Sequence, residues 1–88
     1  MFVGKKPIMN YVLTALPKME ELGGLTVRAR GMSISKAVDV ALILQDRYVK
    51  ECHIDGIDIR TEVLDGENGE KVKVSSIEIR LSSPAAAK

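Results

Sequence analysis

Apolar and polar residues alternate along the chain with two different periods, and the first period is that of a helix. Apolar side chains recur every three or four residues at Met9, Val12, Leu13, Leu16 and Met19. Pro7 suits the first position of this helix, because its missing N–H would be unpaired there anyway. Pro17 should kink or divide the helix. We expect the helix to begin near Pro7 and to end at Gly23-Gly24.

The next two elements have a strand period and then a helix period. Residues 25–29 alternate apolar and polar side chains, which predicts a strand with one buried face that closes at Arg30-Gly31. Helical spacing then resumes and continues to about Lys50, with Ser33 or Ser35 as the capping residue. Its apolar positions are Ile34, Ala37, Val38, Ala41, Leu42 and Tyr48. This pattern predicts the longest uninterrupted helix of the chain.

The second half of the chain predicts a hairpin. One face of the outgoing strand carries Ile57, Ile59, Thr61 and Val63, and residues 65–70 form a turn-rich tip. In the return strand the apolar positions are Val72 and Val74, and then Ile77, Ile79 and Leu81. The parity of the apolar positions therefore changes at Ser75-Ser76, where we expect a β-bulge.

With a short apolar entry at Phe2-Val3, the element order is β-α-β-α-β-β. This order predicts an α/β fold, a two-layer sandwich with a long terminal β-hairpin. A chain of 88 residues is long enough for one compact domain only. We expect that domain to span residues 1–82 and a flexible C-terminal tail to span residues 83–88.

Composition narrows the class of protein. With 45% hydrophobic and 28% charged residues, the chain has the composition of a folded globular domain. It contains no apolar run of membrane-spanning length and no signal-peptide region, which predicts a soluble intracellular protein without membrane contact. Cys52 and His53 are the only cysteine and histidine. One chain can therefore form neither a disulfide nor a multi-ligand zinc site, and we expect no metal and no cofactor.

The net charge of +1 hides an uneven distribution. Residues 1–36 carry six basic and two acidic side chains, a balance of +4, whereas residues 37–88 balance to −3. A local basic face can attract phosphate even when the average charge is small. The Gly4-Lys5-Lys6-Pro7 segment at a helix start is the strongest candidate, because ammonium groups and the positive helix end both favour an anion. The alternative is a solvated lysine pair.

Two further basic groups are candidates for nucleic-acid binding. Arg28 and Arg30 could each hold a phosphate through two N–H groups, and it is equally plausible that they bridge surface carboxylates. Lys71 and Lys73 lie on one side of the return strand, where a basic arm could follow a groove or where edge lysines could discourage aggregation.

The sequence offers few residues for base stacking or for catalysis. Phe2, Tyr11 and Tyr48 are the only aromatic residues, which is too few for a base-stacking platform and favours contact with the backbone of the nucleic acid. Cys52 and His53 are sequence neighbours that would point to opposite faces of a strand, so we expect no catalytic site.

Three segments resemble the signatures of the Alba family, DNA- and RNA-binding chromatin proteins best known from archaea. Val3 to Leu13, with Gly4-Lys5-Lys6-Pro7, looks like the opening motif of that family. Val27 to Gly31 and then Ile34 to Asp39 resemble the second, and Val74 to Ile79 is similar to the third. The segments span nearly the whole chain in the family's order.

The resemblance implies the fold of the C-terminal domain of bacterial translation initiation factor three. It also implies a dimer, a homodimer or a heterodimer with a paralogue, that binds double-stranded DNA and RNA with little sequence preference. It implies phosphate contacts by Lys5, Lys6 and the arginine that matches Arg28 or Arg30, and it places Lys73 on an arm. With the patterns above, the residues that we expect to bind nucleic acid are Lys5, Lys6, Asn10, Tyr11, Arg28, Arg30, Lys71 and Lys73. Tyr48 matches a position at which neighbouring dimers meet, and Lys5 and Lys6 are the implied acetylation sites. Met32, Gln45 and Asp46 replace residues that are often basic, which implies weaker binding.

The function expected from the sequence is sequence-nonspecific coating and compaction of DNA, and of RNA, by a chromosome-associated cytoplasmic protein. The alternative is an RNA-binding assembly subunit of an RNA-processing or translation-related ribonucleoprotein. A coating protein should bind in proportion to nucleic-acid length, whereas an assembly subunit should co-purify with a fixed RNA.

Overall fold

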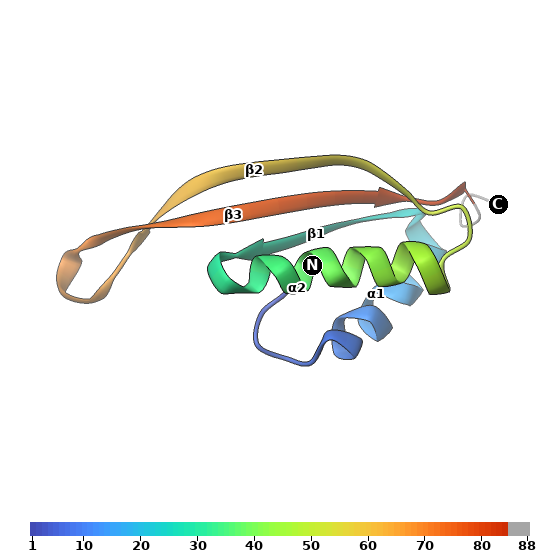
Figure 1. The fold of residues 1–88 in the computed structure, drawn as a ribbon, viewed down its shortest axis with the longest axis horizontal. Coiled ribbons are helices and arrows are strands. Elements are labelled where there is room, and N and C mark those ends of the chain that lie inside the picture. Colours follow the sequence, from blue (N-terminus) through green and yellow to red (C-terminus); the bar gives the residue numbers. More distant parts are fainter. Residues whose placement is uncertain (85–88) are drawn as a thin grey trace.

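The fold is a three-stranded antiparallel sheet with two helices on one face (Figure 1). The computed structural model describes residues 1–84. Its main elements are α1 (Ile8–Leu22), β1 (Gly24–Arg30), α2 (Ile34–Ile43), β2 (His53–Asp65) and β3 (Lys71–Ser82), and β3 lies between β1 and β2. The predicted α/β sandwich with a terminal hairpin is confirmed. Of the expected first strand, one parallel bridge remains, between Phe2 and Arg28.

Helix α1 starts and ends close to the expected residues, with two corrections. Pro7 precedes the helix in an extended conformation (φ −58°, ψ 150°) and is not its first helical residue. Pro17 lies inside α1 without dividing it. Both Pro17 and Leu13, whose carbonyl loses its partner, are exposed, so water can satisfy that carbonyl. Gly23 ends the helix at φ 74°, where its N–H donates to Met19 O at 2.9 Å.

The second helix differs from its prediction. Gly31, at φ 54°, opens a 3₁₀ turn η1 (Gly31–Ser33), and α2 then runs for ten residues before a π turn η2 (Leu44–Tyr48). The longest uninterrupted α-helix is therefore α1, with 15 residues. The spacing of apolar residues could not reveal the change from α-helix to π turn, because a single π turn shifts the apolar positions by only about one residue. Ser33 occupies the cap position but makes no side-chain capping bond.

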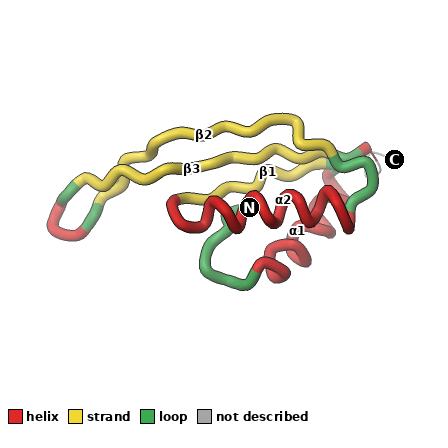
Figure 2. The backbone as a smooth tube through the Cα atoms, viewed as in Figure 1, coloured by secondary structure: helices red, strands yellow, loops and turns green. Residues whose placement is uncertain are grey.

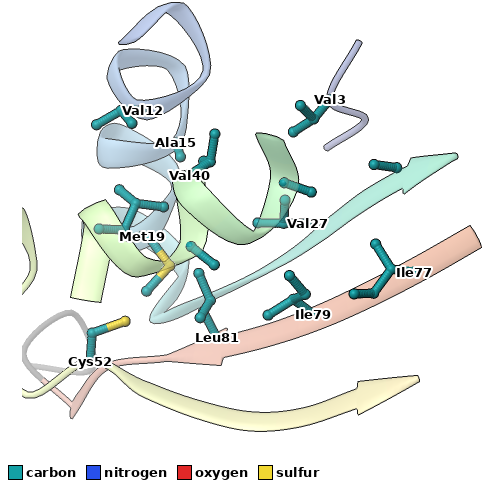
Figure 3. Packing of buried hydrophobic residues seen from close by; sticks show 14 residues of the cluster. Val3, Val12, Ala15, Met19, Val27, Val40, Cys52, Ile77, Ile79 and Leu81 are labelled. Carbon is teal, nitrogen blue, oxygen red and sulfur yellow. The ribbon is translucent and has the colours of Figure 1, made fainter. Parts of the chain in front are cut away.

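The core lies between the two helices and the covered part of the sheet (Figure 3). Helices α1 and α2 contact β1, and α2 also contacts β3. The buried apolar residues are Val3, Val12, Ala15, Met19, Val27, Ala29, Ala37, Val40, Ala41, Leu44, Cys52, Ile77, Ile79 and Leu81. Two members of the predicted α1 stripe, Met9 and Leu13, are exposed.

The predicted bulge at Ser75-Ser76 is wrong. Ser75 and Ser76 pair regularly with Thr61 and Arg60, and the register instead shifts on β2 between Ile54 and Gly56. The apolar positions change parity because the far half of the hairpin lies beyond the helices, so no core selects which of its faces is apolar.

The hairpin projects past the two-layer body and gives the molecule its elongated shape (Figures 1 and 2). The molecule measures 50 × 24 × 18 Å along its principal axes. The tip closes through a 3₁₀ turn, η3 (Glu67–Gly69), where Gly66 N–H donates to Glu70 O at 2.7 Å.

The expected tail begins within the packed body. The N–H of Ser83 donates to Gly23 O, and its hydroxyl donates to Lys50 O, both at 2.9 Å. Ser83 is buried, so the packed body extends through this residue. Residues 85–88 of the expected tail lie outside the described residues.

Candidate nucleic-acid interface

The segment from Gly4 to Pro7 forms an exposed basic loop directly before α1, which we call the lysine loop. Lys5 and Lys6 are both exposed, and neither forms an ion pair with any residue in the described range 1–84. The first turn of α1 has no acidic side chain and no side-chain cap. Two ammonium groups and the positive end of a 15-residue helix therefore coincide, and both attract anions.

Two side chains hold the backbone of the lysine loop from opposite directions. The hydroxyl oxygen of Tyr11 accepts the N–H of Gly4 at 2.9 Å and that of Lys6 at 3.1 Å. The ammonium group of Lys36 donates to the carbonyls of Gly4 at 3.1 Å and Lys6 at 2.8 Å. The loop therefore has a fixed backbone shape, and its lysine side chains project from it.

The electrostatics of Tyr11 reflect this arrangement. Partial desolvation acts to raise the pKa of Tyr11, but the two N–H groups and the charges of Lys36 and Lys6 outweigh it and lower the pKa below its ordinary value. Tyr11 thus supports the loop from a half-buried position. Lys36 was not among the residues singled out in the sequence, because its contact with the loop spans about 30 positions.

A shallow groove of about 470 Å³ runs beside the lysine loop. Its walls include Phe2, Lys6, Asn10 and Tyr11. Asn10 is exposed in the first turn of α1, and its carbonyl accepts the hydroxyl of Thr14 at 2.8 Å. The expected contact residues Lys5, Lys6, Asn10 and Tyr11 are therefore brought together at one place.

Arg28 and Arg30 lie elsewhere, on the sheet face that the helices leave open. Arg28 pairs with Glu78 at 2.9 Å, and Glu78 also pairs with Arg60 at 3.1 Å. Arg30 pairs with Glu62 through two hydrogen bonds of 3.1 and 3.2 Å. The sequence left phosphate binding and ion pairing equally open, and in this structure both arginines are ion-paired.

A further pair and a ring contact complete the open face. Arg80 pairs with Asp58, which lowers the pKa of that carboxyl, first through the hydrogen bond and then through the charge of Arg80. The guanidinium of Arg30 lies 5.3 Å from the centre of the Phe2 ring, within cation–π range. Phe2 also borders the groove of the lysine loop, so Arg30 is close to that site although its charge is neutralised.

The hairpin lysines differ from each other. Lys71 pairs with Asp65 near the tip. Lys73 is exposed opposite Val63 and forms no ion pair within residues 1–84. Of the two, Lys73 is the one whose charge is available to a ligand.

Tyr48 ends the π turn at the opposite end of the helices and is 48% exposed. It borders a cavity of about 300 Å³ together with Leu16, Val49 and Ser83. An exposed aromatic ring beside a cavity is a suitable contact point for a neighbouring particle.

Other kinds of site find little support in residues 1–84. Cys52 is buried, and burial followed by the charge of Asp55 raises the pKa of its thiol, which disfavours the reactive thiolate. His53 is exposed at the start of β2. Within the described chain, no group of three or more His, Cys, Asp or Glu side chains could hold a metal ion. None of the described helices is long and apolar enough to cross a membrane.

Comparison with known proteins gives consistent matches. The family model described as Alba matches residues 1–61. The "DNA/RNA-binding protein Alba" of Methanocella arvoryzae is 51% identical over 87 residues, which cover 98% of this chain and 91% of the relative. The protein of that name from Picrophilus torridus is 46% identical, covering 92% and 91%. The solved structure of Alba from Thermoplasma volcanium superposes with a TM-score of 0.86 at 46% identity, covering 93% of this chain and 96% of the other.

Proposed function

Because this chain belongs to the Alba family of DNA/RNA-binding, non-enzymatic proteins, we propose that it coats double-stranded DNA and RNA through the lysine loop without reading sequence. The observation that carries this proposal is the clamped backbone between Gly4 and Lys6, which presents Lys5 and Lys6 beside the start of α1. Contacts of ammonium groups and helix N–H groups with phosphate position a protein without specifying bases. Asn10, exposed in the same groove, extends the contact surface.

The binding unit is a dimer in this proposal, and β2 offers the surface for it. Ile57 and Ile59 pair across the sheet with the buried Ile79 and Ile77, so they lie on the helix side of the sheet. The helices do not cover β2, and the two side chains are 56% and 78% exposed. Adjacent exposed apolar side chains of this kind mark an interface. A second copy of the chain, related to the first by a two-fold axis, would cover this surface with the same surface of its own β2.

The dimer would present two lysine loops and two hairpin arms. Lys73 on each arm adds a third available ammonium group per protomer. Tyr48 lies away from the lysine loop and is proposed to contact the next dimer along the nucleic acid. Acetylation of Lys5 or Lys6 would remove a positive charge at the phosphate contact and weaken coating. The partner in the dimer is a second copy or a paralogue.

The test is binding of the purified protein to two unrelated duplexes of equal length and to an RNA of that length, measured by fluorescence anisotropy. We expect affinities that agree within a few-fold across the duplexes and that rise with nucleic-acid length. A strong preference for one sequence, or co-purification with one RNA and no length dependence, would favour the assembly-subunit function instead.

A further inference from the structure

We propose that Glu62 acts as a brake on nucleic-acid binding: it competes with phosphate for Arg30, whose guanidinium lies over Phe2 at the edge of the lysine-loop groove. The inference rests on the proposed function. Arg30 donates from Nε to Oε2 of Glu62 at 3.2 Å and from Nη2 to Oε1 at 3.1 Å. The Nε–Nη2 edge, one of the two edges at which a guanidinium holds a phosphate with paired N–H groups, is therefore in use.

The sheet register makes this contact possible. Arg30 on β1 and Arg60 on β2 are both paired with Ser76 on the central strand. Ser76 is small, so the side chain of Arg30 can cross the central strand and reach Glu62 on the far strand. The hydrogen bond from Arg30 lowers the pKa of Glu62, so the carboxylate stays charged at neutral pH.

Arg30 is otherwise well placed to join the nucleic-acid footprint. Its guanidinium lies over Phe2, and Phe2 borders the groove that also contains Lys6 and Asn10. A phosphate that passes the lysine loop could take the Nε–Nη2 edge of Arg30 only by displacing Glu62, and at the other edge it would meet a guanidinium whose charge Glu62 already balances. While Glu62 holds Arg30, that phosphate keeps its condensed cation, so Arg30 adds little to the salt dependence of binding.

Glu62→Gln tests the brake directly, because it keeps the size of the side chain and removes its charge. We expect roughly tenfold tighter binding of a duplex by the dimer at low salt. The slope of log affinity against log salt should become steeper by about 2, one new phosphate contact per protomer at about 0.9 each. Glu21→Gln, at the end of α1 opposite the lysine loop, removes the same charge away from Arg30 and should change affinity by less than about twofold.

A double-mutant cycle with Arg30→Ala separates the brake from general electrostatics. Arg30→Ala alone should weaken binding only slightly, because Glu62 already neutralises that arginine. In the Glu62→Gln background it should abolish the gain in affinity and restore the original slope. All three side chains are at least partly exposed, so circular dichroism should report an unchanged fold.

The inference is overturned if Glu62→Gln and Glu21→Gln have equal effects, or if the gain from Glu62→Gln persists without Arg30. Failure of the proposed function has a different outcome, in which the wild-type protein binds neither duplex nor RNA. If the wild type binds through Lys5 and Lys6 and Glu62→Gln changes nothing, only the brake is wrong.

Discussion

The side chains that matter most for the proposed function act on a backbone rather than on a ligand. Tyr11 accepts two N–H groups of the lysine loop, and Lys36 donates to two of its carbonyls. Such a loop loses little conformational entropy when it binds, because its shape is fixed beforehand. The geometry of Lys5 and Lys6 is thus a property of residues on both helices.

Tyr11→Phe should weaken binding without changing its electrostatics. The variant keeps the ring and loses the oxygen that accepts the Gly4 and Lys6 N–H groups. We expect a loss of about 1 kcal/mol or less in unfolding free energy and a several-fold loss of affinity. The salt slope should stay the same, since no charge at the interface changes. Denaturant titration and anisotropy measure the two effects.

The matched control for this change is Tyr48→Phe. The Tyr48 hydroxyl forms no hydrogen bond with the described part of the chain, so its removal should leave the affinity of one dimer unchanged. If Tyr11→Phe binds as tightly as the wild type, the fixed backbone of the lysine loop is irrelevant to binding.

The sequence could predict which residues belong to the site better than it could predict which residues contact one another. The Gly4-Lys5-Lys6-Pro7 segment could be recognised because its residues are neighbours in the chain. The support from Lys36 and the pairing of Arg30 with Glu62 could not, because each joins residues about 30 positions apart. Only the sheet register, which depends on the whole fold, brings Arg30 and Glu62 together.

Among the elements, β2 has the most unusual environment. One face of β2 carries the exposed side chains of Ile57 and Ile59. The core ends at the neighbouring strand β3, and the helices do not cover these two side chains. Its period-two pattern predicted a strand correctly, but a pattern of this kind cannot say whether the partner of the apolar face lies in the same chain. The exposure of Ile57 and Ile59 is the reason for our proposal that the partner is a second chain.

Replacement of both isoleucines by glutamine should separate the proposed dimer. Burial of an isoleucine contributes about 1.5–3 kcal/mol, and a two-fold interface would contain each one twice. We therefore expect dimer dissociation to become at least roughly hundredfold more favourable, with a folded monomer of 9.6 kDa in light scattering at micromolar concentration.

Met32→Gln is the control for this experiment. Met32 is 99% exposed on η1, outside the apolar face of β2, so its replacement should leave the dimer intact. A wild-type protein that is monomeric at micromolar concentration, or an Ile57→Gln, Ile59→Gln variant that remains dimeric, would exclude β2 as the interface.

The sequence predicted elements well where one face packs against the core and must therefore be apolar. It predicted them poorly where neither face does. Helix α1 ends at Gly23 as expected, and the alternation of β1 matches the burial of Val27 and Ala29. The bulge was misplaced because the parity of Val72 and Val74 belongs to the far half of the hairpin, beyond the helices. The π turn was missed because its apolar spacing differs little from that of an α-helix.

For the molecule as a whole, the proposed function depends more on where the charges lie than on their sum. The net charge is only +1, and the arginines of the open face are paired with Asp58, Glu62 and Glu78. The ammonium groups that we propose meet phosphate are those of Lys5, Lys6 and Lys73, none of which forms an ion pair within residues 1–84. A dimer would therefore direct six of them at phosphates, from two lysine loops and two arms.

The salt dependence of duplex binding tests this account most directly, with wild-type protein compared with the Lys5→Ala, Lys6→Ala variant. Six phosphate contacts per dimer predict a slope of log affinity against log salt of about −5, and the loss of four contacts predicts about −2. The loss of affinity should be equal on two unrelated duplexes. An unchanged slope in the variant would contradict the assignment of the lysine loop as the phosphate-binding site.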